Sequence, residues 1–150
     1  MFVSRFWSNM AMRRTRRGEG NAIPNVYSGA AQLQMTDKVG NGDCVALLRT
    51  YGPLKNRPTG SWREGAKVLG NDQLKPGTAI ATFVHGRYPN RPTGNHAAFY
   101  LRQGPGGFWI IDQFKTAKKI QSRFIKSEGQ FKDGKYIRAS DNADAFSVIE

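Results

Sequence analysis

Residues 79–112 read AIATFVHGRYPNRPTGNHAAFYLRQGPGGFWIID, and three apolar runs in this stretch are separated by Gly- and Pro-rich connections. Short runs of apolar, aromatic and β-branched residues bounded by Gly and Pro are typical of strands, so we predict strands at 79–84, 97–101 and 108–111. The connection Gly104-Pro-Gly-Gly107 is short enough to join the last two as a hairpin. The second half of the chain is therefore predicted to form an antiparallel sheet.

A short helix is predicted before the sheet. Residues 44–51, CVALLRTY, are good helix formers without a break, and Gly52-Pro53 then provides the usual end signals. A second helix is predicted at 61–69, where Ser61 and Glu64 have the spacing of a capping box. Further short strands are predicted at 122–126, around Tyr136 and at 145–149. A helix followed by an antiparallel sheet indicates the α+β class.

The composition is that of one domain with a strong positive charge. With 150 residues, of which 39% are hydrophobic, the chain can close one core, and we expect a single domain over residues 21–150. The 23 Lys and Arg against 11 Asp and Glu give a net charge of +12, which attracts polyanions such as nucleic acid, anionic lipid and acidic cell-wall polymer. No run approaches the ~20 apolar residues that cross a bilayer, so no membrane span is expected.

The first twenty residues, MFVSRFWSNMAMRRTRRGEG, are basic and contain one acid, Glu19. Their Arg cluster at 13–17 follows the apolar residues, whereas the basic residues of a secretory signal peptide come first, so no signal peptide is expected. An Arg-rich segment with so few acids also resembles a transit peptide or an arm that contacts nucleic acid. The composition favours a disordered basic segment over residues 1–20.

Cys44 is the single cysteine, so it cannot form a disulfide within the chain. It is either a buried helical residue or a nucleophile. At the first turn of the predicted helix, unpaired backbone N–H groups favour the thiolate and can hold the oxyanion that forms when a thiolate attacks a carbonyl. The neighbouring Asp43 would raise the pKa of the thiol unless its side chain turns away to cap the helix.

The base that serves such a nucleophile must be one of two histidines, His85 and His96. His96 opens the strand predicted at 97–101, where the sheet would hold its backbone in place. His85 instead begins a Gly- and Pro-rich loop and is expected to be exposed. His96 is therefore the predicted base.

A third polar group usually orients a catalytic imidazole. If the hairpin turn centres near residue 104, Asp112 lies opposite His96, and a shift of half a residue brings Gln113 there instead. We predict Asp112 as this third group, with Gln113 as the alternative. One cysteine and two histidines leave no recognisable zinc spacing, so neither a metal nor a cofactor is expected.

Three segments resemble, in order, those of NlpC-type cysteine peptidases. They are Asp43-Cys44 before an apolar helix, a Pro-Gly-led run from Leu74 to Phe83, and HAAFYL at 96–101. The acid and amide at 112–113 are more similar to the third position of CHAP amidases. The strings GNG-x-CVAL, WREG, GRYPN, TGNHAAFYL, DQ and DAFSVIE resemble those of small bacterial proteins related to the amidase effectors of type VI secretion.

This resemblance covers Val39 to Glu150 and implies a papain-like NlpC/CHAP fold, in which the helix carrying the cysteine packs on an antiparallel sheet. It implies a cysteine amidase or endopeptidase that hydrolyses peptide bonds of bacterial peptidoglycan stem peptides, and an exported antibacterial effector. We expect a monomer that is made in the bacterial cytoplasm and acts in the periplasm or cell wall, with an acidic inhibitor (immunity) protein as a partner. Residues 1–20, and Asp43 where an amide is expected, depart from the family pattern.

Residues around the predicted site are candidates for substrate binding. The aromatic side chains of Tyr51, Trp62 and Tyr88 are predicted to line the cleft, although each is also a typical core residue. Arg87 and Arg91, on the loop before the histidine, are predicted to meet carboxylates of the substrate.

Two other functions remain open on the same residues. In a basic nucleic-acid-binding module, the charge and the aromatic side chains would carry binding and Cys44 would be inert. In an acyltransferase, the acyl-enzyme would pass to an amine instead of to water. The order of cysteine, histidine and acid along the chain favours a thiol enzyme over the binding module, so nucleic acid is not an expected partner. The sequence does not separate hydrolysis from acyl transfer.

Overall fold

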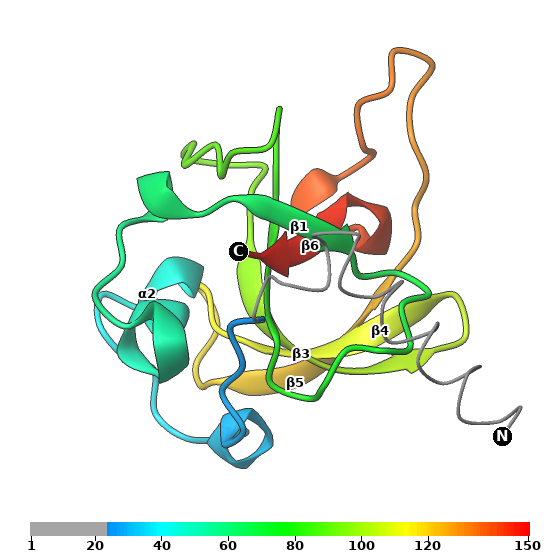
Figure 1. Ribbon diagram of the computed structural model, residues 1–150. Coiled ribbons are helices and arrows are strands. Elements are labelled where there is room, and N and C mark those ends of the chain that lie inside the picture. The colour runs from blue at the N-terminus through cyan, green and yellow to red at the C-terminus, as the bar shows by residue number, and fades with distance from the viewer. Residues whose placement is uncertain (1–23) are drawn as a thin grey trace, which may run out of the picture.

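The computed structural model describes residues 24–150, and the basic segment predicted at 1–20 lies outside the described residues. Six antiparallel strands form one strongly curved sheet in the order β1-β6-β2-β3-β4-β5 (Figure 1). The strands are β1 Glu64–Lys67, β2 Ala79–Thr82, β3 Ala97–Gly104, β4 Gly107–Asp112, β5 Gln121–Lys126 and β6 Phe146–Ile149.

The helix α2 (Cys44–Thr50) packs beside β3, and it ends before Gly52-Pro53 as predicted. Seven residues are too few for a stable helix in water, so tertiary packing must hold it. Leu47 and Leu48 are fully buried, and burial of each contributes about 1.5–3 kcal/mol. Short 3-10 helices occupy several connections: η2 Ala30–Leu33, η3 Gly52–Leu54, η4 Thr59–Ser61, η5 Ala139–Asp141 and η6 Ala143–Ala145.

Both faces of the sheet are buried. Phe99 of β3 packs with Leu47 and Leu48 in one apolar cluster, whereas its neighbour Tyr100 packs with Phe108 in a second cluster. Successive side chains of a strand point to opposite faces, so the two clusters lie on opposite sides of the sheet. This two-sided burial explains why the strands read as continuous apolar runs.

The predicted α+β class is confirmed, but two predicted elements are wrong. The segment predicted as a helix at 61–69 contains β1, and Glu64 accepts a hydrogen bond from Ser147 of β6 at 2.6 Å instead of capping a helix. The strand predicted around Tyr136 is reduced to one bridge with Gln130, in a segment that projects from the body between β5 and η5 (Figure 1). Within residues 24–150, no helix has the length and apolarity that a membrane crossing needs.

Candidate active site

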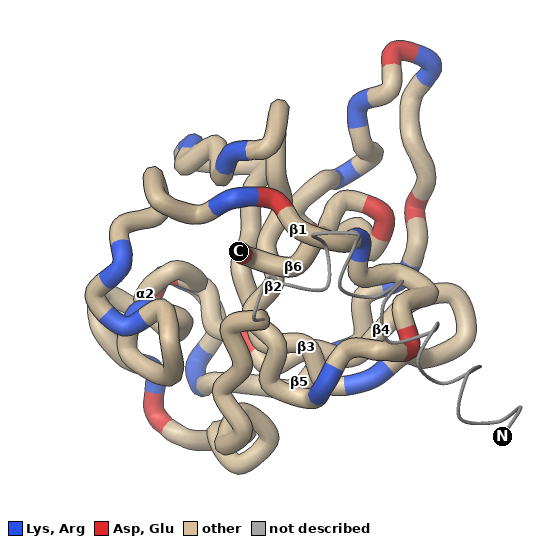
Figure 2. Tube along the Cα trace, viewed as in Figure 1, with Lys and Arg blue, Asp and Glu red and all other residues tan. Residues whose placement is uncertain are grey.

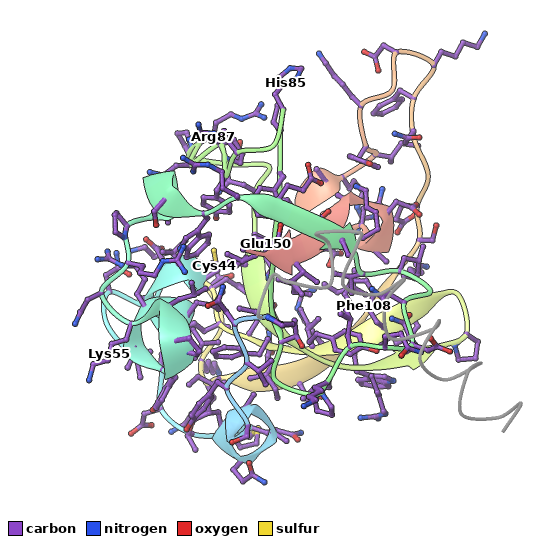
Figure 3. All side chains as sticks on the ribbon, viewed as in Figure 1. Cys44, Lys55, His85, Arg87, Phe108 and Glu150 are labelled. Carbon is purple, nitrogen blue, oxygen red and sulfur yellow. The ribbon has the colours of Figure 1, made fainter. Side chains whose placement is uncertain are left out.

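Cys44 begins α2, and its side chain is half-buried (Figure 3). Asp43, at the N-cap position, makes no capping hydrogen bond. Its carboxylate instead accepts a hydrogen bond from Asn41 Nδ2 at 3.0 Å and lies 3.6 Å from Lys115 Nζ. The acid beside the thiol is therefore paired with a lysine.

Gln113 fixes the loop that leads into α2. Its side chain is fully buried, its Oε1 accepts a hydrogen bond from the backbone N–H of Val39 at 3.0 Å, and its Nε2 donates to the carbonyl oxygens of Val39 and Asp43. Because Gln113 directly follows β4, these three bonds join the end of β4 to the residues just before Cys44. Gln113 therefore holds the loop that precedes Cys44, which is a different role from the one considered for it beside His96.

His96 precedes β3 and is held by β2. Its backbone N–H donates to Thr82 Oγ1, and its carbonyl oxygen accepts from the Thr82 N–H, both at 3.0 Å. Its Nε2 lies 2.7 Å from Oδ2 of Asp112, the last residue of β4. The contact expected between His96 and Asp112 is thus present in the fold.

The strand register that produces this contact differs from the predicted one. The hairpin turn lies at Pro105-Gly106, and a bulge between Tyr100 and Arg102 shifts the register, so that Phe99 pairs with Ile111. Continued by one residue, this register sets Asp112 opposite Ala98 instead of opposite His96. The imidazole therefore reaches the carboxylate as a diagonal neighbour, a distance that a long side chain can span.

The charges of these groups support one another. Burial would raise the pKa of the Cys44 thiol, but the hydrogen bond and positive charge of His96, with a backbone N–H from Ala97, hold that pKa below its ordinary value. Burial would lower the pKa of His96, but hydrogen bonds to Asp112 and Cys44 raise it to about 9. These shifts favour a thiolate beside an imidazolium, which is the reactive state of a cysteine nucleophile.

The carboxylate of Asp112 has a second cationic partner. Arg123 of β5 donates from Nε to Oδ2 of Asp112 at 2.8 Å, so this oxygen accepts hydrogen bonds from both His96 and Arg123. Burial would raise the pKa of Asp112, but its bonds to the two cations hold that pKa below the ordinary value. Sequence reasoning alone does not find Arg123, because β5 reads QSRFIK and an arginine is ordinary in an edge strand.

Tyr88 lies against the thiol of Cys44. Its hydroxyl oxygen is 3.8 Å from Cys44 Sγ and accepts a hydrogen bond from Asn95 Nδ2 at 3.0 Å. Since Asn95 fills an acceptor position of the hydroxyl, the hydroxyl proton is available to the sulfur. Burial and the nearby thiolate raise the pKa of Tyr88, so it stays a neutral donor.

Cys44, Tyr88 and His96 line an open cleft of ≈ 760 Å³. Its rim carries the charged residues Asp43, Arg49, Arg91 and Lys115. Three of these four side chains are cationic, so the cleft suits a substrate that bears carboxylates. Arg91, which is predicted to meet carboxylates of the substrate, is one of the residues that line the cleft.

The other residues predicted to bind substrate do not line the cleft. Trp62 is fully buried, and its ring packs against Tyr88 with 5.1 Å between centroids, so it supports the cleft wall from behind. Tyr51 stacks on Tyr27 at 5.2 Å, and Arg87 is exposed with its guanidinium near the carbonyl oxygen of Gly60. None of these three residues is part of the cleft lining.

His85 and Cys44 lie far apart in the fold. Figure 3 shows His85 at the tip of a loop, pointing away from the body and from Cys44. It is exposed and has a positive φ of 50°. This placement agrees with its prediction as a loop histidine. In the part of the chain that the structure describes, no group of three or more His, Cys, Asp and Glu side chains is arranged to hold a metal ion.

The model of the family described as domesticated amidase effector 2 matches residues 15–149. The chain belongs to this family. A relative, the type VI secretion amidase effector 2 protein of Salmonella typhi, is 44% identical over 135 residues, which cover 85% of this chain and 100% of that protein. A solved structure of type 6 secretion amidase effector 2 (Tae2) has a TM-score of 0.76 and 45% identity, and the match covers 83% of this chain and 93% of that one.

Membership in the domesticated amidase effector 2 family confirms the resemblance to type VI secretion amidase effectors that the sequence strings indicate. The match also begins at residue 15, within the basic segment and ahead of Val39, where the resemblance in the sequence starts. The family therefore includes part of the N-terminal region that was expected to depart from it.

Proposed function

We propose that the chain is a cysteine amidase that hydrolyses peptide bonds in the stem peptides of bacterial peptidoglycan and serves as an antibacterial effector. Membership in the amidase effector family supports the reaction class, and the charges at the rim of the cleft support an anionic peptide as substrate. The observation that carries the proposal is the contact of His96 Nε2 with Asp112 at 2.7 Å beside a Cys44 thiol of lowered pKa. A papain-like fold of the NlpC/CHAP kind, comprising one catalytic domain, fits this order of cysteine helix, histidine strand and acid.

In the first half of the reaction, the Cys44 thiolate attacks the scissile carbonyl carbon and a C–S bond forms. Because Nε2 of His96 is held by Asp112, Nδ1 is the ring nitrogen left to serve the thiol. The imidazolium gives its proton to the leaving amine as the C–N bond breaks, which leaves an acyl-enzyme. The carboxylate of Asp112 keeps the ring in the required tautomer and orientation.

In the second half, water releases the acyl group. Neutral His96 takes a proton from the attacking water, a C–O bond forms, and the C–S bond breaks to restore the thiolate. The oxyanion of each tetrahedral intermediate needs donors near Cys44 Sγ. The backbone N–H of Cys44, in the first turn of α2, and the hydroxyl of Tyr88 are suitably placed donors.

The proposed site acts in the cell wall or periplasm, and its maker needs protection from it. We propose an acidic inhibitor protein that covers the Cys44 cleft, because charge complementarity speeds association with a strongly basic target. The net charge of +12 and the cationic rim of the cleft support this choice of partner.

The test is release of peptide fragments from purified peptidoglycan, followed by mass spectrometry, with four variants that are first checked for native folding. Cys44→Ala should abolish turnover, and His96→Ala should do nearly the same. Asp112→Asn should retain a fold and lose roughly one to four orders of magnitude in activity, because the ring loses its orienting charge. His85→Ala is the matched control and should have wild-type activity.

Each possible result has a distinct meaning. Full activity in folded Cys44→Ala would refute the cysteine mechanism. Loss of activity in His85→Ala with retention in His96→Ala would show that His85 is the base and that the assignment to His96 is wrong. Products joined to an added amine, instead of free carboxylates, would show an acyltransferase on the same site.

A further inference from the structure

Arg123 connects Asp112 of the proposed catalytic site to η5. Its Nε donates to Oδ2 of Asp112 at 2.8 Å, and its Nη1 donates to Oδ1 of Asp141 at 2.6 Å. Asp141 belongs to η5, so one guanidinium links β4, β5 and η5. The planar fork of an arginine can hold two carboxylates at fixed angles, which a lysine cannot do.

The guanidinium is also confined by what surrounds it. The side chain of Arg123 is 28% exposed, and its guanidinium lies over the ring of Phe114 at 5.4 Å from the centroid. The charged or titratable groups near this cluster are Asp112 from β4, His96 before β3, Cys44 from α2 with Tyr88 beside its sulfur, Asp141 from η5 and Arg138 at the start of η5.

Asp112 would behave differently without this partner. The carboxylate is fully buried and its Oδ2 is shared between His96 and Arg123. A buried carboxylate whose single cationic partner is an imidazolium tends to take the proton of that imidazolium, because burial raises the pKa of the carboxyl group. A second positive charge nearby lowers that pKa and opposes the transfer. The guanidinium therefore keeps the carboxylate ionised and keeps the proton on His96 transferable.

We propose that Arg123 is a positioning residue for the reaction, which orients Asp112 through its fork and whose charge sets the pH range in which Cys44 and His96 form an ion pair. The inference rests on the proposed function. A purely structural role would make the pair of Arg123 with Asp141 a salt bridge that contributes only to stability. The two roles differ in one measurable way, because only the proposed one moves the titration of the thiol.

The test uses the pH dependence of alkylation of Cys44 by iodoacetamide, a neutral reagent, in the full-length protein. Its rate follows the thiolate fraction and requires no substrate. In Arg123→Gln, loss of a positive charge favours every protonated form, so the thiol titration should move to higher pH by about one unit. Both limbs of the pH profile for peptide release should move the same way, with turnover lowered at least about tenfold.

Arg138→Gln is the matched control, because Arg138 also pairs with Asp141, at 3.0 Å, but makes no contact with Asp112. It should leave the thiol titration and turnover unchanged. If Arg123→Gln folds and titrates as wild type does, the proposal is wrong. If Arg123→Gln does not fold, Arg123→Lys replaces it: the charge is kept and the fork is lost, so the titration should stay near wild type while turnover falls about tenfold or more.

Wild-type turnover in folded Arg123→Lys would overturn the positioning role. Because alkylation needs no peptidoglycan, a shifted thiol titration in a protein that cleaves none would refute the proposed function and leave only the effect of Arg123 on the titration of Cys44. If the wild-type protein cleaves peptidoglycan but the thiol titration of Arg123→Gln is not shifted, the proposed function stands and the role proposed for Arg123 is wrong.

Discussion

His96 lies between a carboxylate and a thiol, and this position determines the pH range in which the site can work. The imidazole is buried and contacts Asp112, and its pKa is raised to about 9. The thiol has a pKa below its ordinary value through the same histidine. Between these two pKa values, the thiolate and the imidazolium are present together.

We predict that kcat/KM for peptidoglycan fragments falls above about pH 9, because the imidazolium that protonates the leaving amine is then lost. The acidic limb belongs to Cys44, whose thiolate is lost as pH falls through its lowered pKa. The measurement is the pH profile of kcat/KM, with unfolding excluded by circular dichroism at each pH. An alkaline limb near the ordinary histidine value of about 6.5 would show that Asp112 does not act on His96 as described.

At the scale of elements, the site depends on the attachment of α2 to β4. Cys44 comes from a short helix, whereas His96 and Asp112 come from a hairpin more than fifty residues further along the chain. The three side-chain bonds of Gln113 cross this separation, because they bind the backbone of the loop that precedes α2.

We predict that Gln113→Leu lowers the free energy of unfolding by about 1–3 kcal/mol, because the half-buried backbone N–H of Val39 loses its partner and the carbonyl oxygens of Val39 and Asp43 each lose one of two donors. The loosened loop should also slow alkylation of Cys44. Chemical denaturation and alkylation kinetics measure the two effects.

Gln103→Leu is the control for this experiment. Gln103 likewise clamps a loop with three side-chain bonds, to the backbone of Val68, Gly70 and Asn71, but it lies in β3 away from Cys44. It should reduce stability and leave the alkylation rate unchanged. Equal slowing in both variants would mean that Gln113 has no specific effect on the nucleophile.

The elements that could be predicted from the sequence are those with local signals. The end of α2 is marked by Gly52-Pro53, and the β3–β4 hairpin is marked by the Gly-rich connection at 104–107. The helix predicted at 61–69 fails because Ser61 and Glu64 imitate a capping box, whereas Glu64 pairs with Ser147, 83 residues away. No local pattern reports such a distant partner.

The candidate site could also be predicted only where its signals are local. His96 and Asp112 could be paired because they flank one hairpin, but their diagonal geometry comes from a bulge with no signal in the sequence. The burial of Trp62 and the contact of Arg123 with Asp112 depend on how separate strands pack. The sequence therefore predicts the contact of His96 with Asp112 better than it predicts which residues line the cleft.

At the scale of the whole molecule, the positive charge is spread over the surface. Figure 2 shows Lys and Arg around α2, on the strands and on the projecting segment between β5 and η5. Residues from 41 onward hold 17 Lys and Arg against 9 Asp and Glu. A distributed charge of this kind produces a long-range attraction to an anionic wall polymer, in addition to any contact made in the cleft.

We predict that binding of folded Cys44→Ala to purified cell wall weakens as salt rises, because the Debye length shortens from roughly 14 Å at 0.05 M to about 4 Å at 0.5 M. A triple variant of exposed lysines outside the cleft, Lys75→Gln, Lys118→Gln and Lys132→Gln, should bind less at low salt and show a smaller salt dependence. Binding is measured by sedimentation with the wall. Salt-independent binding would assign recognition to the cleft alone.

The half-buried sulfur of Cys44 has a consequence for the redox sensitivity of the protein. A low-pKa thiolate in an open cleft is the kind of sulfur that peroxide oxidises to a sulfenic acid. Many oxidant-exposed proteins rescue that acid with a second cysteine, which resolves it as a disulfide, but this chain contains no other cysteine. Recovery of an oxidised molecule therefore depends on a thiol from another molecule. Where such thiols are scarce, an oxidative burst would inactivate the protein.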